Sequence, residues 1–150
     1  MNAPTFSLQN QNGETISLAD YAGRWLILYV YPKDDTPGCT TEACSFRDNI
    51  ALFEGNGVAI LGISKDTVTS HRKFVDKYNL PFDLLSDPTA ETIKAYGAWG
   101  KKKFMGKEYD GIMRKTFIIG PNGEIKKEYP NVTPAEHAQQ ILADLVELQA

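Results

Sequence analysis

Two uninterrupted apolar runs constrain the fold of this chain more than any other feature. The first covers residues 25–31 (Trp-Leu-Ile-Leu-Tyr-Val-Tyr), and the second covers residues 58–63 (Val-Ala-Ile-Leu-Gly-Ile). Such runs are typical of strands that are covered on both faces of a sheet. Each is followed by a segment, residues 43–53 and 68–78, in which apolar residues recur at helical spacing. Alternating strands and helices predict an α/β domain with helices on both faces of a central sheet.

Two hairpins are predicted to add antiparallel strands to this sheet. Residues 6–8 and 15–18 alternate apolar and polar side chains around a segment rich in turn formers, which predicts an N-terminal β-hairpin. Further along, the strand-like residues 116–119 and 124–129 flank the turn sequence Pro-Asn-Gly at 121–123. The central sheet is therefore expected to be mixed.

Capping residues predict where several helices begin. Asp66 and Asp87 are N-cap candidates, the second followed by a proline, and residues 133–136 (Thr-Pro-Ala-Glu) fit a capping box for a last helix. Residues 18–23 form either a single helical turn or a loop. Residues 97–111 hold four glycines, four lysines and three aromatic residues without any period, so we expect a loop there.

Length and composition limit the class of protein. The 150 residues contain no repeat, low-complexity segment or linker, so we expect a single domain over residues 1–150. A net charge of −3 argues against a nucleic-acid-binding protein, which would need a basic surface. The first residues do not resemble a signal peptide, and no apolar run approaches the ~20 residues of a membrane span. We therefore expect a cytoplasmic protein, in a compartment where thiols are usually reduced.

The chain has two cysteines, and the first lies where a strand is predicted to end and a helix to begin. Two cysteines are too few for a disulfide-rich scaffold or a four-cysteine zinc site. At Cys39, the unpaired N–H groups and partial positive charge of a helix N-terminus would favour a thiolate over a thiol. The thiolate is the nucleophilic form of cysteine. The carboxyl end of a central strand is also where open α/β sheets bind ligands.

Cys44 follows five residues later on the same predicted helix. In an intact helix the two Cα atoms would be roughly 8–9 Å apart, whereas a disulfide usually needs ~4.4–6.8 Å. A bond between Cys39 and Cys44 would therefore require the first helical turns to unwind. The alternative is that Cys44 is simply a small buried apolar residue.

The residues around Cys39 resemble a known active-site motif. The sequence Pro-Lys-Asp-Asp-Thr-Pro-Gly-Cys at 32–39 fits the peroxiredoxin pattern of proline, three residues, threonine, two residues and cysteine. Its continuation through residue 48 is similar to the bacterioferritin comigratory protein, or PrxQ, subgroup. The same holds for residues 99–100, 104–107 and 109–111, and for Arg114 ahead of the strand at 116–119. The resemblance covers nearly the whole chain and implies a thioredoxin-like fold.

The resemblance implies a role for each residue of the motif. Cys39 would be the peroxidatic cysteine, whose thiolate attacks a peroxide oxygen and becomes a sulfenic acid. Thr36 would offer its hydroxyl to the thiolate and the peroxide, Arg114 would hold positive charge near the sulfur, and Pro32 would shield the sulfenate from water. The N–H groups of Gly38 and Cys39 would stabilise negative charge. Outside the family, Thr36 would be interpreted as a turn or cap residue and Arg114 as a solvated charge.

The same resemblance implies a catalytic cycle within one chain. Cys44 would be the resolving cysteine, forming an intramolecular disulfide that thioredoxin reduces. The substrates would be hydrogen peroxide and organic hydroperoxides, and the protein would be a monomer without a cofactor; no phosphate-binding or dinucleotide-binding glycine motif is found. Two other hypotheses remain, a thiol–disulfide oxidoreductase and a non-enzymatic holdase. The first usually has two residues between its cysteines, against four here.

Other polar residues are assigned less specific roles. His71 and His137 lie in predicted helices without a second ligand at metal spacing, so we interpret them as surface or packing residues. We expect Asp34 and Asp35 to be solvated loop charges rather than an acid/base pair. The basic run at 101–103 is expected to be exposed to solvent.

Overall fold

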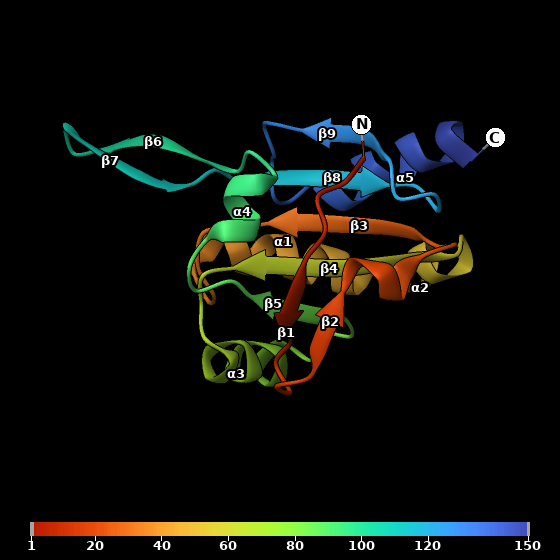
Figure 1. The fold of residues 1–150 in the computed structure, drawn as a ribbon, viewed down its shortest axis with the longest axis horizontal. Coiled ribbons are helices and arrows are strands. Elements are labelled where there is room, and N and C mark those ends of the chain that lie inside the picture. The colour runs from red at the N-terminus through yellow and green to blue at the C-terminus, as the bar shows by residue number, and fades with distance from the viewer. Residues whose placement is uncertain (1, 150) are drawn as a thin grey trace.

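The computed structural model describes residues 2–149 and contains the expected mixed sheet (Figure 1). Seven strands form it, in the order β2-β1-β5-β4-β3-β8-β9. Their bounds are β1 Ser7–Gln9, β2 Thr15–Ser17, β3 Trp25–Val30, β4 Val58–Ser64, β5 Asp83–Ser86, β8 Lys115–Ile119 and β9 Ile125–Tyr129. β3, β4 and β5 are parallel, while the N-terminal hairpin and the β8–β9 hairpin add antiparallel strands. Both predicted hairpins are confirmed.

Helices cover both faces of this sheet. They are α1 Pro37–Asp48, α2 Ile50–Gly55, α3 Val68–Tyr78, α4 Glu91–Ala95 and α5 His137–Gln149, with a short 3₁₀ helix at Leu18–Tyr21. Side chains of α1, α2, α3 and α5 share one apolar cluster with the sheet, and α4 and the N-terminal segment share the other. Across residues 2–149, none of these helices has the length and apolar character needed to cross a membrane.

The central strand β3 shows why the first apolar run has no polar interruption. Ile27 and Tyr29 belong to the cluster under α1, whereas Leu26, Leu28 and Val30 belong to the cluster on the opposite face. All five side chains are at most 1% exposed. Because successive strand residues point to opposite faces, a strand buried on both sides must be apolar throughout. β3 ends beside α1, and this junction carries Cys39.

The prediction of a loop over residues 97–111 was wrong. This segment is an antiparallel hairpin of β6 (Trp99–Phe104) and β7 (Lys107–Ile112), which projects from the body of the molecule in Figure 1. Its turn residues Met105 and Gly106 both have positive φ, 52° and 79°, as a tight two-residue hairpin turn requires. Most of the ribbon is exposed, so its sequence shows no alternation of apolar and polar side chains.

Three predicted helix starts were also wrong. Thr67, not Asp66, caps α3, because its side-chain oxygen accepts a hydrogen bond from the Ser70 N–H at 3.1 Å. Asp87 accepts a bond from the Ile93 N–H at 2.9 Å, but α4 begins later, at Glu91. The continuous apolar pattern of residues 43–53 spans two helices, because the chain breaks at Asn49 between α1 and α2. The Thr-Pro-Ala-Glu segment forms a turn, and α5 starts after it.

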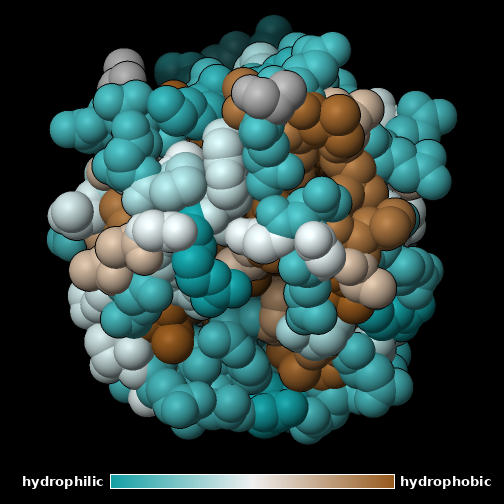
Figure 2. Space-filling view, turned by 90° about the vertical axis from the view of Figure 1, so that its right-hand side faces the viewer, coloured by the Kyte–Doolittle hydropathy of each residue, from teal (hydrophilic) through white to brown (hydrophobic). Residues whose placement is uncertain are grey.

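Apolar surface gathers at the end of the molecule away from the β6–β7 hairpin. Figure 2 shows this end, with brown apolar patches between teal polar side chains. α2 and the C-terminal part of α5 lie on this side in Figure 1, and they carry the exposed residues Leu52 and Val146. β3 and β4 point away from this end, so the N-terminus of α1 lies on the hairpin side.

Candidate active site

Cys39 lies in the first turn of α1 and is almost completely buried. Cys39 is 1% exposed and packs in the apolar cluster under α1. Thr36 is the N-cap of the helix, and Pro37 occupies its first turn. Proline is favoured there because its fixed φ suits the helix and its missing N–H would be unpaired anyway. The predicted position of Cys39 at a strand-to-helix junction is confirmed.

Arg114 contacts the sulfur of Cys39 directly. The residue lies just before β8, the strand paired with β3, and its Nη2 donates a hydrogen bond to Cys39 Sγ at 3.1 Å. A guanidinium is always charged, and a buried site screens its charge less than water does. The contact therefore stabilises a thiolate at Cys39. It brings together two predicted site residues that are 75 positions apart in the sequence.

Glu42 is a residue of this site that sequence reasoning missed. It lies three positions after Cys39 in α1, is fully buried, and accepts a hydrogen bond from Arg114 Nη1 at 2.6 Å. Its other oxygen, Oε2, has no hydrogen-bond partner among the described residues. Burial raises the pKa of Glu42 to about 7, although the nearby Arg114 charge opposes this. Its spacing from Cys39 could have indicated it, since residues three positions apart share one face of a helix.

Arg114 thus joins two groups that compete for one guanidinium. One edge faces the Cys39 sulfur and the other faces the Glu42 carboxyl group. The Glu42 bond fixes the orientation of the guanidinium, while an ionised Glu42 partly compensates its charge. When Glu42 carries a proton, it does not compensate the Arg114 charge, and more of that charge acts on the Cys39 sulfur than when Glu42 is ionised.

Thr36 and Pro32 lie in the loop between β3 and α1, which leads into Cys39. Both are half-buried. The Thr36 hydroxyl donates a hydrogen bond to the Lys33 carbonyl oxygen at 2.8 Å. Because a hydroxyl has a single proton, its donation to the Cys39 thiolate would require the side chain to rotate. In the observed geometry its oxygen can instead accept a hydrogen bond from a ligand.

Gly38 allows Arg114 to approach the helix closely. A Cβ atom at Gly38 would lie 3.3 Å from Arg114 Nη2 and 3.9 Å from Pro134 Cγ. The turn before α5 therefore borders the same site. The N–H groups of Gly38 and Cys39 belong to the first turn of α1, where backbone donors have no partner within the helix.

Cys44 lies further along α1 as a free, half-buried thiol. Cys39 is also free, and the intact helix separates the two. Cys44 borders a surface hollow between α1 and the start of α5, which is lined in part by Thr41, Ser45 and Gln139. The residue is therefore neither fully buried nor placed to bond with Cys39 without a change in the helix.

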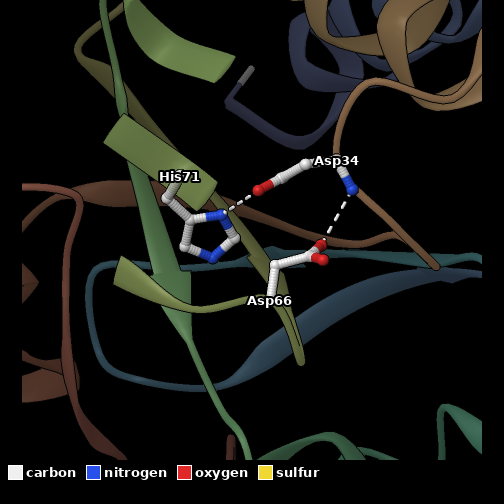
Figure 3. Close-up of side chains that lie close together, drawn as sticks. All are labelled: Asp34, Asp66 and His71. Carbon is white, nitrogen blue, oxygen red and sulfur yellow. Dashed lines mark hydrogen bonds and ion pairs between the residues drawn. The ribbon is translucent and has the colours of Figure 1, made fainter. Parts of the chain in front are cut away.

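Asp34 differs from its expected role. Asp34 is buried, and its carboxylate oxygen Oδ2 lies 2.7 Å from His71 Nδ1 (Figure 3). The prediction of a solvated Asp34 was wrong, because its partners come from α3, 37 positions away. The neighbouring Asp35 is exposed, as expected. His71 and His137 are both buried, which confirms packing positions for them.

A possible metal site at this cluster is not supported by its hydrogen bonds. Asp34, Asp66 and His71 offer ligand atoms that all lie within 4.8 Å of one another. However, His71 Nε2 faces the Leu85 carbonyl oxygen at 2.9 Å, and its Nδ1 faces Asp34. Both ring nitrogens are engaged, and Asp66 Oδ2 accepts two further bonds, from the Asp34 N–H and the Ser64 hydroxyl. The cluster is a hydrogen-bond network.

Comparison with known proteins identifies the family. Residues 1–128 match the AhpC/TSA family. Peroxiredoxin Bcp of Bacillus subtilis (strain 168) is 44% identical over 146 residues, covering 97% of this chain and 93% of the relative. The putative peroxiredoxin bcp of Coxiella burnetii is 48% identical over 143 residues, covering 95% of each. The solved structure of the Xanthomonas campestris bacterioferritin comigratory protein has a TM-score of 0.92 at 36% identity, covering 97% of this chain and 92% of that one. The chain therefore belongs to the AhpC/TSA family and, within it, to the Bcp/PrxQ peroxiredoxins, which reduce peroxides with a thiol on a thioredoxin fold.

Proposed function

We propose that Cys39 is the peroxidatic cysteine of this protein. The observation that carries the proposal is the 3.1 Å contact between Arg114 Nη2 and the buried Cys39 sulfur. Attack on an O–O bond needs an anionic, polarisable nucleophile and positive charge near the reacting oxygens. The thiolate supplies the first, and the guanidinium supplies the second.

The first step oxidises the cysteine and splits the peroxide. The Cys39 thiolate attacks the terminal oxygen of a hydroperoxide, an S–O bond forms, and the O–O bond breaks. The departing alkoxide or hydroxide takes up a proton and leaves as an alcohol or water, and Cys39 becomes a sulfenic acid. In this proposal, Thr36 is a hydrogen-bonding group for the peroxide, and Pro32 shields the sulfenic acid from water.

Cys44 is the resolving cysteine in this proposal. Its thiol condenses with the Cys39 sulfenic acid to give an intramolecular disulfide and one water. Cys44 is reachable from solvent, whereas Cys39 is buried, so the first turns of α1 must open for the two sulfurs to meet. A dithiol reductant, which we infer to be thioredoxin, then returns both cysteines to thiols.

The proposed substrates are hydrogen peroxide and organic hydroperoxides. The Xanthomonas campestris relative has alkyl peroxide reduction activity, which supports the second class. Since both cysteines belong to one chain, the cycle needs no second subunit, and we propose a monomer that acts in antioxidant defence in the cytoplasm. No bound cofactor takes part in these steps.

Peroxide-dependent NADPH consumption with thioredoxin and its reductase tests this function. We expect turnover in the unchanged protein and none in Cys39→Ser. In Cys44→Ser, one equivalent of peroxide should still oxidise Cys39, but the loss of two hydrogens that marks the disulfide should be absent from the mass spectrum. Equal turnover in the unchanged protein and Cys39→Ser would refute the peroxidase function. Absence of the disulfide in the oxidised, unchanged protein would refute the resolving role of Cys44.

A further inference from the structure

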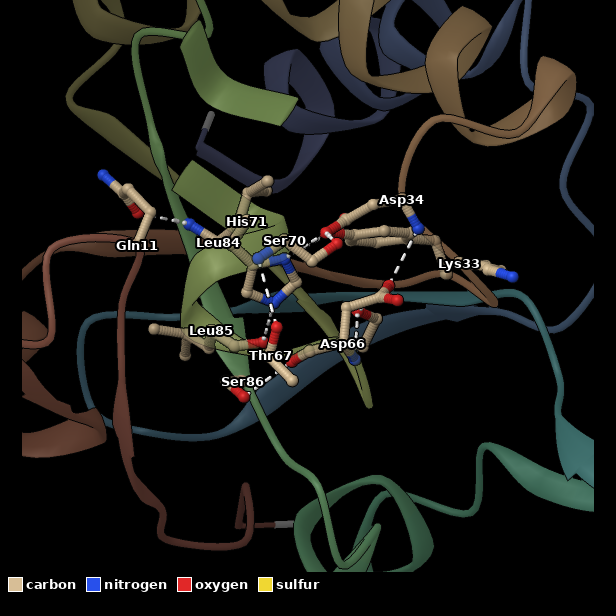
Figure 4. A network of polar contacts seen from close by, with 12 residues as sticks. Gln11, Lys33, Asp34, Asp66, Thr67, Ser70, His71, Leu84, Leu85 and Ser86 are labelled. Carbon is tan, nitrogen blue, oxygen red and sulfur yellow. Dashed lines mark hydrogen bonds and ion pairs between the residues drawn. The ribbon is translucent and has the colours of Figure 1, made fainter. Parts of the chain in front are cut away.

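We propose that the buried pair of Asp34 and His71 is a positioning device for Thr36, and thereby for peroxide reduction at Cys39. The pair lies outside the contacts of the sulfur itself, in a network that joins the active-site loop to α3, β4 and β5 (Figure 4). This inference rests on the proposed function of Cys39. It concerns how the loop between β3 and α1 is held in place.

The active-site loop is fastened to α3 through Asp34. Its carboxylate is 4% exposed and accepts hydrogen bonds from the Tyr31 hydroxyl, from the Ser70 hydroxyl at 2.8 Å and from His71 Nδ1 at 2.7 Å. A carboxylate can accept about four such bonds, so three donors nearly fill its capacity. The adjacent Asp35 is fastened to the same helix, through Lys77 and Tyr78, but at the surface.

The hydrogen bonds of His71 fix where the protons of the pair lie. A carbonyl oxygen only accepts, so Nε2 must carry a proton toward the Leu85 oxygen. The hydroxyls of Tyr31 and Ser70 donate to Asp34, which leaves one proton shared between Asp34 and Nδ1 of His71. The pair is therefore neutral as a unit, which is the arrangement that a fully buried carboxyl group needs.

One peptide unit transmits this anchoring to Thr36. The peptide bond between Lys33 and Asp34 donates its N–H to Asp66 Oδ2 at 2.8 Å, and its carbonyl oxygen accepts the Thr36 hydroxyl at 2.8 Å. Because a peptide group is planar and rigid, fixing its N–H fixes its carbonyl as well. The orientation of the Thr36 hydroxyl is thus set by groups on the β4–α3 connection and on α3. Thr36 is in turn the N-cap of the helix that carries Cys39.

Loss of this anchoring should slow the reaction of Cys39 with peroxide more than it changes the stabilisation of the Cys39 thiolate. The Arg114 contact that stabilises the thiolate comes from the β8 side and does not involve the loop network. A displaced Lys33 carbonyl would turn the Thr36 hydroxyl away from the peroxide, and displacements of this kind cost reaction rate steeply. The two effects can therefore be separated by comparing a peroxide with a simple alkylating reagent.

The test measures two reactions of Cys39 in Asp34→Asn. In this variant one acceptor oxygen becomes an amide NH2 group, which cannot accept the hydrogen bond that the Tyr31 or Ser70 hydroxyl donates to that oxygen of Asp34. We expect the rate of Cys39 oxidation by hydrogen peroxide to fall about tenfold or more, while alkylation of Cys39 by iodoacetamide stays within about twofold. Asp76→Asn is the matched control, because Asp76 is an exposed carboxylate of α3 that pairs with Arg72 and not with the active-site loop, and it should leave both rates unchanged. If Asp34→Asn does not fold, Ser70→Ala takes its place. It removes one hydrogen bond to Asp34 and should show the same selective loss of the peroxide rate to a smaller degree.

Two substitutions of His71 identify which of its contacts matters. The side-chain nitrogen of asparagine can occupy the position of Nδ1, and that of glutamine the position of Nε2. If His71 acts through Asp34, His71→Asn should keep more peroxide reactivity than His71→Gln. Retention by His71→Gln instead would mean that His71 only supports β5 through Leu85, and would overturn the proposal.

Two further outcomes would also overturn it. One is an unchanged peroxide rate in Asp34→Asn. The other is a loss of peroxide rate in Asp34→Asn that comes with faster alkylation of Cys39, because this pattern indicates a loosened fold. Ile93→Ala provides the reference for that pattern, since it truncates the core on the opposite face of the sheet without touching the loop. If peroxide does not oxidise Cys39 in the unchanged protein, the proposed function itself fails, and this result is distinct from a failure of the Asp34 variants alone.

Discussion

Gly38 shows how a single missing side chain can serve the site. Alanine in place of a helical glycine usually stabilises a protein by about 0.5–1 kcal/mol, and no positive φ requires glycine here. A Cβ atom at this position would, however, lie 3.3 Å from Arg114 Nη2. The guanidinium would have to move by a few tenths of an ångström, away from the sulfur it contacts.

We therefore expect Gly38→Ala to slow Cys39 oxidation by roughly tenfold without lowering the free energy of unfolding. The measurement is the second-order rate with hydrogen peroxide, together with a denaturant titration. Gly55→Ala is the matched control, because no described heavy atom lies within 4 Å of the added Cβ. That variant should keep the wild-type rate. Equal rates in Gly38→Ala and the unchanged protein would show that the glycine is not needed for the Arg114 contact.

Glu42 and Asp34 mark the limit of prediction at the scale of residues. The sequence singles out Cys39 by its place at a strand-to-helix junction, and Thr36 and Arg114 by the resemblance to a family; the catalytic roles of all three stay predictions. The burial of Asp34 depends on Ser70 and His71, which only the folded chain brings near it. A charged residue in a loop is usually solvated, so no local pattern could reveal this environment.

In the proposed cycle, helix α1 has to satisfy two opposed requirements. Intact, it holds Cys39 beside Arg114 and keeps Cys44 away; opened, it would let the two sulfurs join. Phe46 limits how far the helix can open, since its ring is fully buried against Tyr29 and Phe53, at centroid distances of 4.8 and 5.9 Å. We infer that opening is confined to the turns of α1 before Phe46 and to the N–H groups that bond to carbonyl groups of those turns.

Amide hydrogen exchange checks this local opening. In the oxidised protein we expect faster exchange at residues 40–47, because the disulfide breaks hydrogen bonds of the first turns of α1, while α2 and α3 keep their protection. Cys44→Ser treated with peroxide is the control, as it forms the sulfenic acid without the disulfide and should keep α1 protected. Identical protection in reduced and oxidised protein would contradict the opening of the helix.

Elements were predictable where burial leaves a pattern in the sequence. β3 and β4 are covered on both faces, so their apolar runs located them correctly. The β6–β7 hairpin has no such cover, and Lys101, Lys102 and Lys103 follow one another regardless of face. The cap of α3 was predicted wrongly for a related reason, because the partner of Asp66 comes from elsewhere in the chain. Asp66 accepts a hydrogen bond from the Asp34 N–H in another loop, and Thr67 caps α3 instead.

At the scale of the whole molecule, the buried Glu42 makes stability depend on pH. Burial raises its pKa from 4.5 to about 7 in the folded protein. Below about pH 4.5 the group is protonated in both the folded and unfolded states and adds no pH dependence. As the pH rises toward 7, the unfolded chain releases this proton while the folded protein retains it, so the free energy of unfolding falls. Above about pH 7 the effect levels off, after a total of about 3 kcal/mol.

Glu42→Gln removes this ionisation while keeping a similar shape and an acceptor for Arg114. Relative to the unchanged protein, we expect the variant to gain about 3 kcal/mol in the free energy of unfolding between pH 4.5 and pH 8. Urea titrations of both proteins across this range measure the difference. Glu54→Gln, at an exposed position of α2, controls for the loss of one acidic charge and should follow the unchanged protein. If Glu42→Gln shows the same pH slope as the unchanged protein, Glu42 does not hold its proton in the folded state. In that case an ionised carboxylate would compensate Arg114 at neutral pH, and the positive charge available to the Cys39 sulfur would be smaller throughout the physiological range.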